Sequence, residues 1–247
     1  MPIICAKRAN GNERAGIEQA NTVRTLFIGE TPRYPMCLVA RSELRFGFQK
    51  HLIRFRRAEQ MQTLDEWNAE LVLTNSHDAG CAYALQVGIY RRLCSNGLVV
   101  SDQEFEAIRF RHANLQTQEV VLASFRILEY VPKLGALIER FRNCQLNDSQ
   151  ALAFAQQALL LRYDSLDRAS VEARTLLTPR RAEDQASDLW TTFNRVQENL
   201  VRGGLSDFKR NRLGRLRTLR SLRGIDSKIM LNKGLWTLAE QTANELN

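Results

Sequence analysis

No stretch of this 247-residue sequence approaches the roughly 18 consecutive apolar residues that a membrane-spanning helix needs. The N-terminal sequence MPIICAKRANGNERAG lacks the apolar run of a secretory signal, so none is expected. Proline is scarce, with 5 residues, and glycine is moderate, with 13, while charged residues make up 25% of the chain. These proportions exclude collagen-like, low-complexity and wholly disordered classes and are typical of an ordinary globular protein.

Cysteines are few, odd in number and far apart. They are Cys5, Cys37, Cys81, Cys94 and Cys144. Such a set favours reduced thiols and a cytoplasmic location over a disulfide framework. No CxxC or HxxxH pair is present, so His77, Cys81 and Cys94 do not make a convincing metal site. No glycine-rich phosphate loop follows a predicted strand, and no cofactor is expected.

Positive charge is concentrated near the C-terminus. The chain has 35 basic and 27 acidic residues, a net charge of +8. Residues 202–233 contain ten basic and two acidic side chains, which accounts for the whole excess, because the remaining residues are balanced at 25 of each sign. Concentrated positive charge attracts polyanions through counterion release. We therefore expect a local contact with nucleic acid, single-stranded DNA being favoured.

The segment 210–223 reads RNRLGRLRTLRSLR, with a leucine at every third position. On a helix these leucines would spiral across about half the circumference, and the arginines would occupy the rest. One interpretation is a phosphate-binding arm that becomes ordered on contact. The alternative is a solvated linker whose arginines pair with acidic residues of the helices. The predicted phosphate-binding residues here are Arg210, Arg212, Arg215, Arg217, Arg220 and Arg223.

A second basic group falls on predicted strands. If these strands are neighbours, arginines lie beside Tyr90 and Phe46 on one sheet face, where guanidinium and ring groups can bind single strands. The alternative is that edge-strand charges prevent aggregation. The predicted nucleic-acid contacts of this group are Arg54, Arg56, Arg91 and Arg92.

Arg180 and Arg181, in the sequence TPRR at 178–181, complete the predicted binding residues. The alternative here is a helix-entry turn, in which one of these arginines binds Asp184 or Asp188.

Apolar periodicity predicts an α+β fold, in which a mostly antiparallel sheet is followed by a group of helices. Residues 1–33 are predicted to form an irregular leader, and residues 34–247 to form one domain. The β-rich region spans 34–113, with strands expected at 36–41, 51–57, 71–74, 81–93, 98–101 and 104–111. The helical region spans 114–201, and a basic arm with a final helix spans 202–247.

Several residues predict where the helices begin, bend and end. Pro132 predicts a kink within the helical stretch 116–144, and Asn147 a cap for the helix that follows. An amphipathic helix is expected at 183–201, ending at the pair Gly203 and Gly204, and Asp226 is expected to cap the final helix.

Trp190 and Trp236 are predicted as core residues. Asn194, Gln197 and Glu198 share one polar helical face, which either binds bases or docks against the sheet.

The sequences NSHD at 75–78 and CSN at 94–96 contain the residue types of a nucleophile and base. In principle His77 could activate Cys94 or Ser76, with Asp78 orienting the imidazole. The spacing does not require this, because asparagine, serine and aspartate are also ordinary turn residues. No catalytic residue is therefore predicted, and an enzyme is not expected.

Three stretches together resemble a known family: NSHDAGCAYALQVGIYRRLCSNGLVV (75–100), TPRRAEDQASDLWTTFNRVQENLVRGGL (178–205) and GIDSKIMLNKGLWTLAE (224–240). In order and spacing they resemble the phage/plasmid-like family of domain of unknown function 932, over about residues 35–243. The matching motif positions are Asn75, Ser76, His77, Asp78, Cys94, Ser95, Asn96, Gly97, Trp190, Asn194, Gln197 and Asn199.

The resemblance implies a protein of a mobile genetic element. It supports the conjecture of a role in phage-type recombination, similar to single-strand annealing proteins, with self-association into a homo-oligomer. The alternative is a factor that contacts a protein, either to block a host defence or to regulate a plasmid function.

Overall fold

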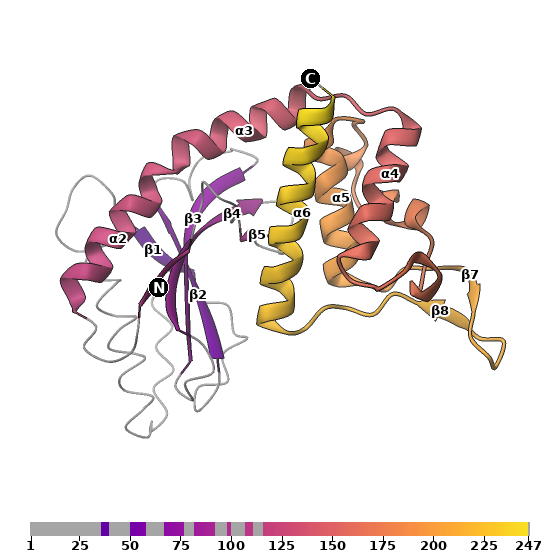
Figure 1. Cartoon of the computed structure of the whole chain (residues 1–247), viewed down its shortest axis with the longest axis horizontal. Helices are drawn as coiled ribbons and strands as arrows, with labels where there is room; N and C mark the ends of the chain where they lie inside the picture. The colour runs from indigo at the N-terminus through magenta and orange to yellow at the C-terminus, as the bar shows by residue number, and fades with distance from the viewer. Residues whose placement is uncertain are drawn as a thin grey trace. The chain divides into compact units, whose positions relative to one another are not determined.

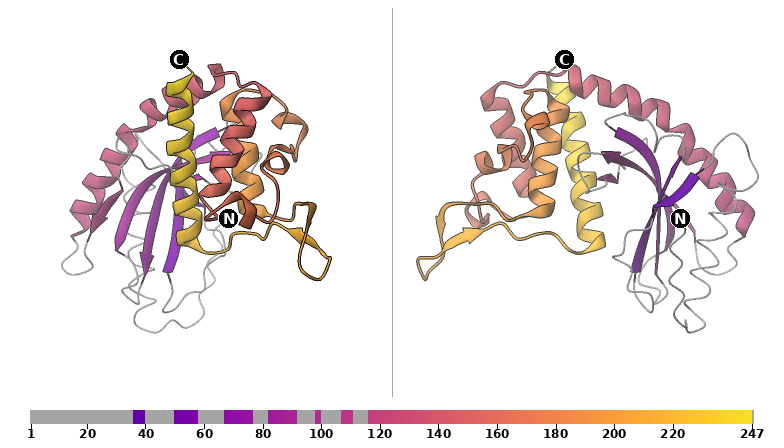
Figure 2. Two further views of the ribbon diagram at one scale, coloured as in Figure 1. Left: turned by 45° about the vertical axis from the view of Figure 1, so that its right-hand side comes forward. Right: turned by 180° about the vertical axis from the view of Figure 1, so that it is seen from behind.

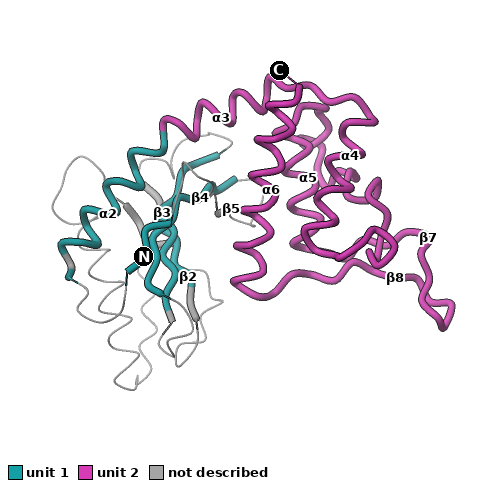
Figure 3. The backbone as a smooth tube through the Cα atoms, viewed as in Figure 1, with its two compact units in different colours: residues 1–131 teal, residues 132–247 magenta. Residues whose placement is uncertain are grey.

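The computed structural model describes residues 36–39, 50–57, 67–76, 82–91, 98–99, 107–110 and 116–246. The chain divides into two compact units, residues 1–131 and 132–247, which are described separately below (Figure 3). The boundary falls inside the region predicted as helical. Strands come first along the chain and helices dominate the second half, which confirms the predicted α+β class. The predicted leader, 1–33, lies outside the described residues.

The first unit contains an antiparallel sheet (Figure 1). Its strands are β1 (Met36–Val39), β2 (Lys50–Arg57), β3 (Trp67–Ser76), β4 (Tyr83–Arg91), β5 (Leu98–Val99) and β6 (Ile108–Phe110). The order is β1-β2-β3-β4-β5, and β6 also pairs with β4. Each predicted apolar run thus contributes a strand. β3 extends beyond the predicted 71–74, because strands pair with it on both sides. Its outer positions include polar residues, so the apolar run marked only part of the strand.

The two faces of this sheet differ in polarity but are both buried at the centre. Phe55, Leu71 and Val87 lie side by side on the apolar face, where each is almost fully buried. The opposite face includes the buried Glu70 and Gln86. Helix α2 (Thr117–Glu129) packs against β3 and β4. Both faces of the central strands are buried. Alternate residues along a strand therefore differ in polarity here, although they do not differ in exposure.

The second unit is mainly helical (Figures 1 and 2). Its elements are α3 (Val131–Asn143), α4 (Asp148–Leu160), α5 (Leu189–Arg202), α6 (Ile225–Glu245), the 3₁₀ turns η2 (Leu166–Arg168), η3 (Ala173–Leu177) and η4 (Ala182–Asp184), and the strands β7 (Ser206–Arg210) and β8 (Leu216–Thr218).

Three of the predicted helix boundaries are confirmed. The helical stretch breaks between α2 and α3, next to Pro132. Asn147 caps α4 through a capping box, in which its side chain accepts from the backbone N–H of Gln150 at 2.9 Å. Gly203 ends α5 with a φ of 64°, a conformation that favours glycine.

Two predicted helix starts are wrong. α5 begins at Leu189 rather than at residue 183, because the Asp188 carboxylate accepts from the Thr191 N–H at 2.8 Å and caps the helix there. The final helix has Gly224 at its N-cap, so Asp226 is not the cap. Asp226 lies in the first turn, where its negative charge is favourable near the helix N-terminus.

Aromatic side chains from three helices form the centre of the second unit, as predicted for the tryptophans. The Trp190 ring stacks on Phe193 with centroids 5.8 Å apart, and the rings of Phe193 and Trp236 form a T-shaped pair with centroids 6.1 Å apart. Phe141 of α3 contacts Trp236 at 5.2 Å. All four side chains are buried. α3, α5 and α6 therefore share one core, from which β7 and β8 extend.

Candidate nucleic-acid interface

The arginine-rich segment forms a β-hairpin, not the helical arrangement considered from its leucine spacing. We call residues 206–218, which comprise β7, the turn and β8, the basic hairpin. Leu213 at its tip is 78% exposed, whereas Leu219 just beyond β8 is fully buried. The leucines therefore do not share a face. A positive φ of 72° at Gly214 is the local reason, because it closes a turn and is incompatible with a continuous helix.

Hydrogen bonds define the hairpin turn. The backbone N–H of Asn211 donates to the carbonyl of Arg215 at 2.8 Å, and that of Gly214 donates back to the carbonyl of Asn211 at 2.9 Å. The side-chain oxygen of Asn211 also accepts from the N–H groups of Leu213 and Arg215. Asparagine commonly makes this kind of side-chain turn. These hydrogen bonds give the tip that presents Arg212 and Arg215 a defined turn conformation.

Residues on the inner face of the basic hairpin attach it to the rest of the helical unit. The Asp207 carboxylate accepts from the backbone N–H of Glu172, next to η3. Lys209 donates to the carbonyl of Leu166 at 3.1 Å, and Arg217 donates to the carbonyl of Arg168 at 2.7 Å. These bonds attach the hairpin to the segments around η2 and η3.

The outer face of the basic hairpin is exposed and combines an aromatic ring with cations. Phe208 is 92% exposed, and Arg210 and Leu216 are its exposed neighbours on the same face. Both views in Figure 2 show the hairpin extending away from the helices of its unit. Phe208, Leu213 and Leu216 are all exposed on the hairpin and are interleaved with arginines, and grouped rather than single exposed apolar side chains mark interaction sites. The outer face therefore presents an aromatic ring beside cations, a combination found in surfaces that bind single strands.

The arginines of the segment are not paired with carboxylates in the described part of the chain. The side chains of Arg210 and Arg217 donate to backbone carbonyls, and Arg212, Arg215 and Arg223 are exposed. Ion pairs between described residues involve other arginines, such as Arg202 with Glu198 at 3.0 Å. Within that part, the alternative of arginines pairing with helix acids is therefore wrong for this segment.

Arg54 and Arg91 do not share one surface, which corrects the second predicted basic group for these two residues. β3 lies between β2 and β4, so the strands bearing Arg54 and Arg91 are not neighbours. Arg54 forms an ion pair with the buried Glu70, and Arg91 is itself buried. Alternation also places these two arginines on opposite faces of the sheet. For Arg56 only the backbone in β2 is described, and Arg92 lies outside the described residues.

Arg180 and Arg181 bind partners other than the predicted Asp184 or Asp188. Arg180 donates to the side-chain oxygen of Asn199 and to the carbonyl of Gly203. Arg181 forms an ion pair with Glu198 at 2.7 Å. Both arginines thus attach the 178–181 turn to α5. The expected pairing with Asp184 or Asp188 is wrong, but the arginines do have a structural role at the turn before the helix.

The polar residues Gln197, Glu198 and Asn199 of α5 lie inside the helical unit rather than on a base-binding face. Gln197 donates to Asn232 of α6 at 3.1 Å, and Asn199 donates to the carbonyls of Leu176 and Thr178 at 2.8 and 2.9 Å. Asn194 bonds the Trp190 carbonyl within its own helix. Gln197 and Asn199 are buried, so their motif positions support the packing of α5.

The residues of the considered nucleophile-and-base set are mostly undescribed. His77, Asp78, Cys94, Ser95, Asn96 and Gly97 lie outside the described residues, and Ser76 is described only as backbone. Asn75 is buried at the end of β3. Cys144 is a free, buried cysteine, and burial raises the pKa of its thiol, an effect that nearby Arg140 opposes. The described residues include no group of three potential metal ligands.

The sequence interpretation missed Phe208, the most exposed aromatic side chain of the described chain. The sequence SDFKR at 206–210 has no alternation of apolar and polar residues, so no signal of that kind marked Phe208 as an outward-facing strand residue. The alternation appears only in the structure, where Ser206, Phe208 and Arg210 are the exposed positions of β7.

Comparison with known proteins agrees with the resemblance in the sequence. The family described as domain of unknown function 932 (DUF932) matches residues 19–236. The chain belongs to this family. Two relatives, the UPF0380 proteins YafZ and YfjQ of Escherichia coli strain K12, are each 34% identical over 197 residues, which cover 80% of this chain and 70% of each relative. No solved structure matches this DUF932 chain. In the parts of the DUF932 chain described here, no helix is long and apolar enough to cross a membrane.

Proposed function

We propose that this protein binds single-stranded nucleic acid, with single-stranded DNA favoured, through the outer face and tip of the basic hairpin. The observation that supports the proposal is the exposed Phe208 beside arginines that have no carboxylate partner among the described residues. Five basic residues and one acidic residue in the hairpin give it a net charge of +4. An aromatic ring can stack on a base, and guanidinium groups beside it can bind the phosphates of the same strand.

The proposed binding mode needs no conformational change of the hairpin. Arg212 and Arg215 at the tip neutralise phosphates and release condensed counterions. Phe208 stacks on an exposed base, which a single strand offers and a duplex does not. Because Asp207 and Arg217 already attach the hairpin to its unit, little ordering entropy opposes binding.

The role in the cell that fits this activity is accessory and non-enzymatic. Holding a single strand with its bases accessible is what a strand-annealing or recombination factor of a phage or plasmid requires, and this role is part of the proposal. Self-association along the strand would follow from such a role.

The proposal is tested by fluorescence anisotropy with labelled single-stranded and duplex oligonucleotides of the same sequence, across a salt series. We expect tighter binding to the single strand. The logarithm of the binding constant should fall with the logarithm of salt concentration, with a slope of roughly 0.7 for each neutralised phosphate. Binding that does not change with salt, or no binding to any nucleic acid at low salt, would refute the proposal and leave a protein partner as the alternative.

Replacing Phe208 by alanine should weaken single-strand binding about tenfold, because stacking on an aromatic ring contributes roughly 1–3 kcal/mol per base. The slope of the salt dependence should not change, since no charge is removed. The matched control is Met230→Ala, which removes a side chain that is 73% exposed on α6. Equal affinities for the wild type and Phe208→Ala would exclude stacking at this position.

A further inference from the structure

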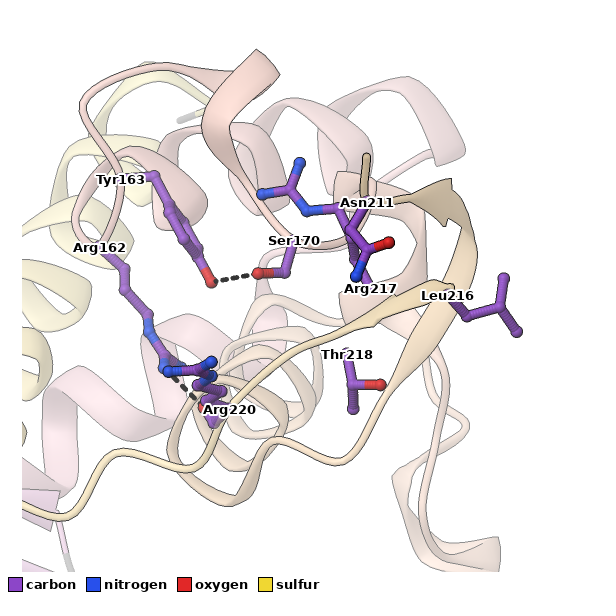
Figure 4. A pocket seen from close by; sticks show the side chains of 8 residues that line it. All are labelled: Arg162, Tyr163, Ser170, Asn211, Leu216, Arg217, Thr218 and Arg220. Carbon is purple, nitrogen blue, oxygen red and sulfur yellow. Dashed lines mark hydrogen bonds between the residues drawn. The ribbon is translucent and has the colours of Figure 1, made fainter. Parts of the chain in front are cut away.

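A pocket of about 630 Å³ lies between the basic hairpin and the segment that follows α4 (Figure 4). Three arginines line it, namely Arg162, Arg217 and Arg220, and its other lining residues include Tyr163 and Ser170. Among the described residues, no acidic side chain lines this pocket. A concave site with several cations and no carboxylate is complementary to a multiply charged anion.

Two of these arginines are held in place by backbone carbonyls. The two terminal nitrogens of Arg162 donate to the carbonyls of Leu200 and Arg220, each at 2.6 Å. Arg217 donates to the carbonyl of Arg168 at 2.7 Å. Each guanidinium has five N–H donors, so both retain donors for a ligand. Positioning before binding lowers the entropic cost of recognition.

Tyr163 and Ser170 supply neutral groups to the same pocket. The Tyr163 hydroxyl donates to the Ser170 oxygen at 3.3 Å, as Figure 4 shows. The Arg162 guanidinium lies 5.8 Å from the centre of the Tyr163 ring. The pocket thus offers an aromatic ring and hydroxyl groups beside its cations, which are the groups that recognise a nucleoside as well as its phosphate.

We propose that this pocket binds the phosphate monoester of a nucleotide. A monoester has a charge close to −2 at neutral pH, whereas each diester of the strand backbone has −1, so three uncompensated guanidinium groups favour the monoester. The pocket volume falls within the roughly 300–1,000 Å³ of small-molecule sites. The inference rests on the proposed function when the monoester is the end of a bound strand. A free mononucleotide offers the same chemistry.

The experiment compares a labelled single-stranded oligonucleotide with a 5′-phosphate, one with a 3′-phosphate, and one with hydroxyl groups at both ends. We expect one of the phosphorylated strands to bind about tenfold more tightly than the unphosphorylated strand, a difference of 1.4 kcal/mol. Competition with thymidine monophosphate distinguishes a free nucleotide from a strand end as the source of the monoester. Displacement of the phosphorylated strand identifies the free nucleotide as a ligand too, while no displacement restricts the site to strand ends.

Two variants test whether the pocket causes this preference. Arg220→Gln removes an exposed lining cation, and Ser170→Ala removes a hydroxyl without changing charge. Each should reduce the tenfold preference for phosphate to about threefold or less. The matched control, Arg126→Gln, removes an exposed arginine from α2 and should retain the full preference. Retention of the preference in both pocket variants would refute the assignment.

The outcomes separate this inference from the proposed function. Equal affinities for phosphorylated and unphosphorylated strands would overturn the pocket assignment and leave strand binding by the hairpin intact. Binding of thymidine monophosphate without binding of any oligonucleotide would overturn the proposed function and support the pocket. If the protein binds neither an oligonucleotide nor thymidine monophosphate, both proposals are refuted.

Discussion

The double variant Arg212→Gln/Arg215→Gln is expected to bind single-stranded DNA about 60-fold more weakly than the wild type at 50 mM salt. Both side chains are exposed at the tip of the basic hairpin. If each neutralises one phosphate, counterion release contributes roughly 0.9 logarithmic units of affinity per residue at this salt concentration. The slope of the salt dependence should fall by about 1.4, because two contacts of roughly 0.7 each are lost.

Anisotropy titrations at several salt concentrations measure both quantities. The matched control is the double variant Lys133→Gln/Arg126→Gln, which removes the same charge from exposed positions on α3 and α2. It should retain nearly the full slope. If both double variants lose affinity equally, net charge alone explains binding, and the basic hairpin is not the binding site.

A double variant at the tip should fold normally. The hydrogen bonds that define the turn involve the side chain of Asn211 and backbone groups, not the side chains of Arg212 and Arg215. Arg210 is unsuitable for this test, because it donates to the carbonyl of Gly214 at 2.7 Å and contributes to the turn.

Features encoded by neighbouring residues could be predicted from the sequence. The strands appear as apolar runs, and Asn147 and Pro132 mark a helix start and a helix break through local backbone chemistry. The tryptophans of α5 and α6 follow from helical periodicity. These signals act within a few residues, so no knowledge of the tertiary fold is required.

Features that depend on pairing between distant residues could not be predicted. Nothing in the sequence of β2 indicates that β3 separates it from β4, and the expected arginine face depended on that order. The ion pair of Arg181 with the buried Glu198 joins residues 17 positions apart. Leucine spacing in the 210–223 segment misled for a different reason. A period of three does not match the 3.6 residues per turn of an α-helix, and Gly214 favours a turn.

Replacing Asn199 by alanine is expected to lower the free energy of unfolding by about 3 kcal/mol. Its side chain is fully buried, donates to two backbone carbonyls and accepts from Arg180. Each lost hydrogen bond costs roughly 1 kcal/mol, and a buried partner left unsatisfied costs more. The 176–181 segment would lose its attachment to α5, because alanine can replace none of these bonds.

Urea unfolding followed by tryptophan fluorescence measures this change, and Asn194→Ala is the matched control on the same helix. Asn194 bonds only the Trp190 carbonyl, within its own helix, and is partly exposed, so the control should stay within about 0.5 kcal/mol of the wild type. Under native conditions both variants should bind single-stranded DNA as the wild type does. A loss of DNA affinity in Asn199→Ala without a loss of stability would instead place α5 at the nucleic-acid contact, because a buried structural asparagine changes folding before it changes binding.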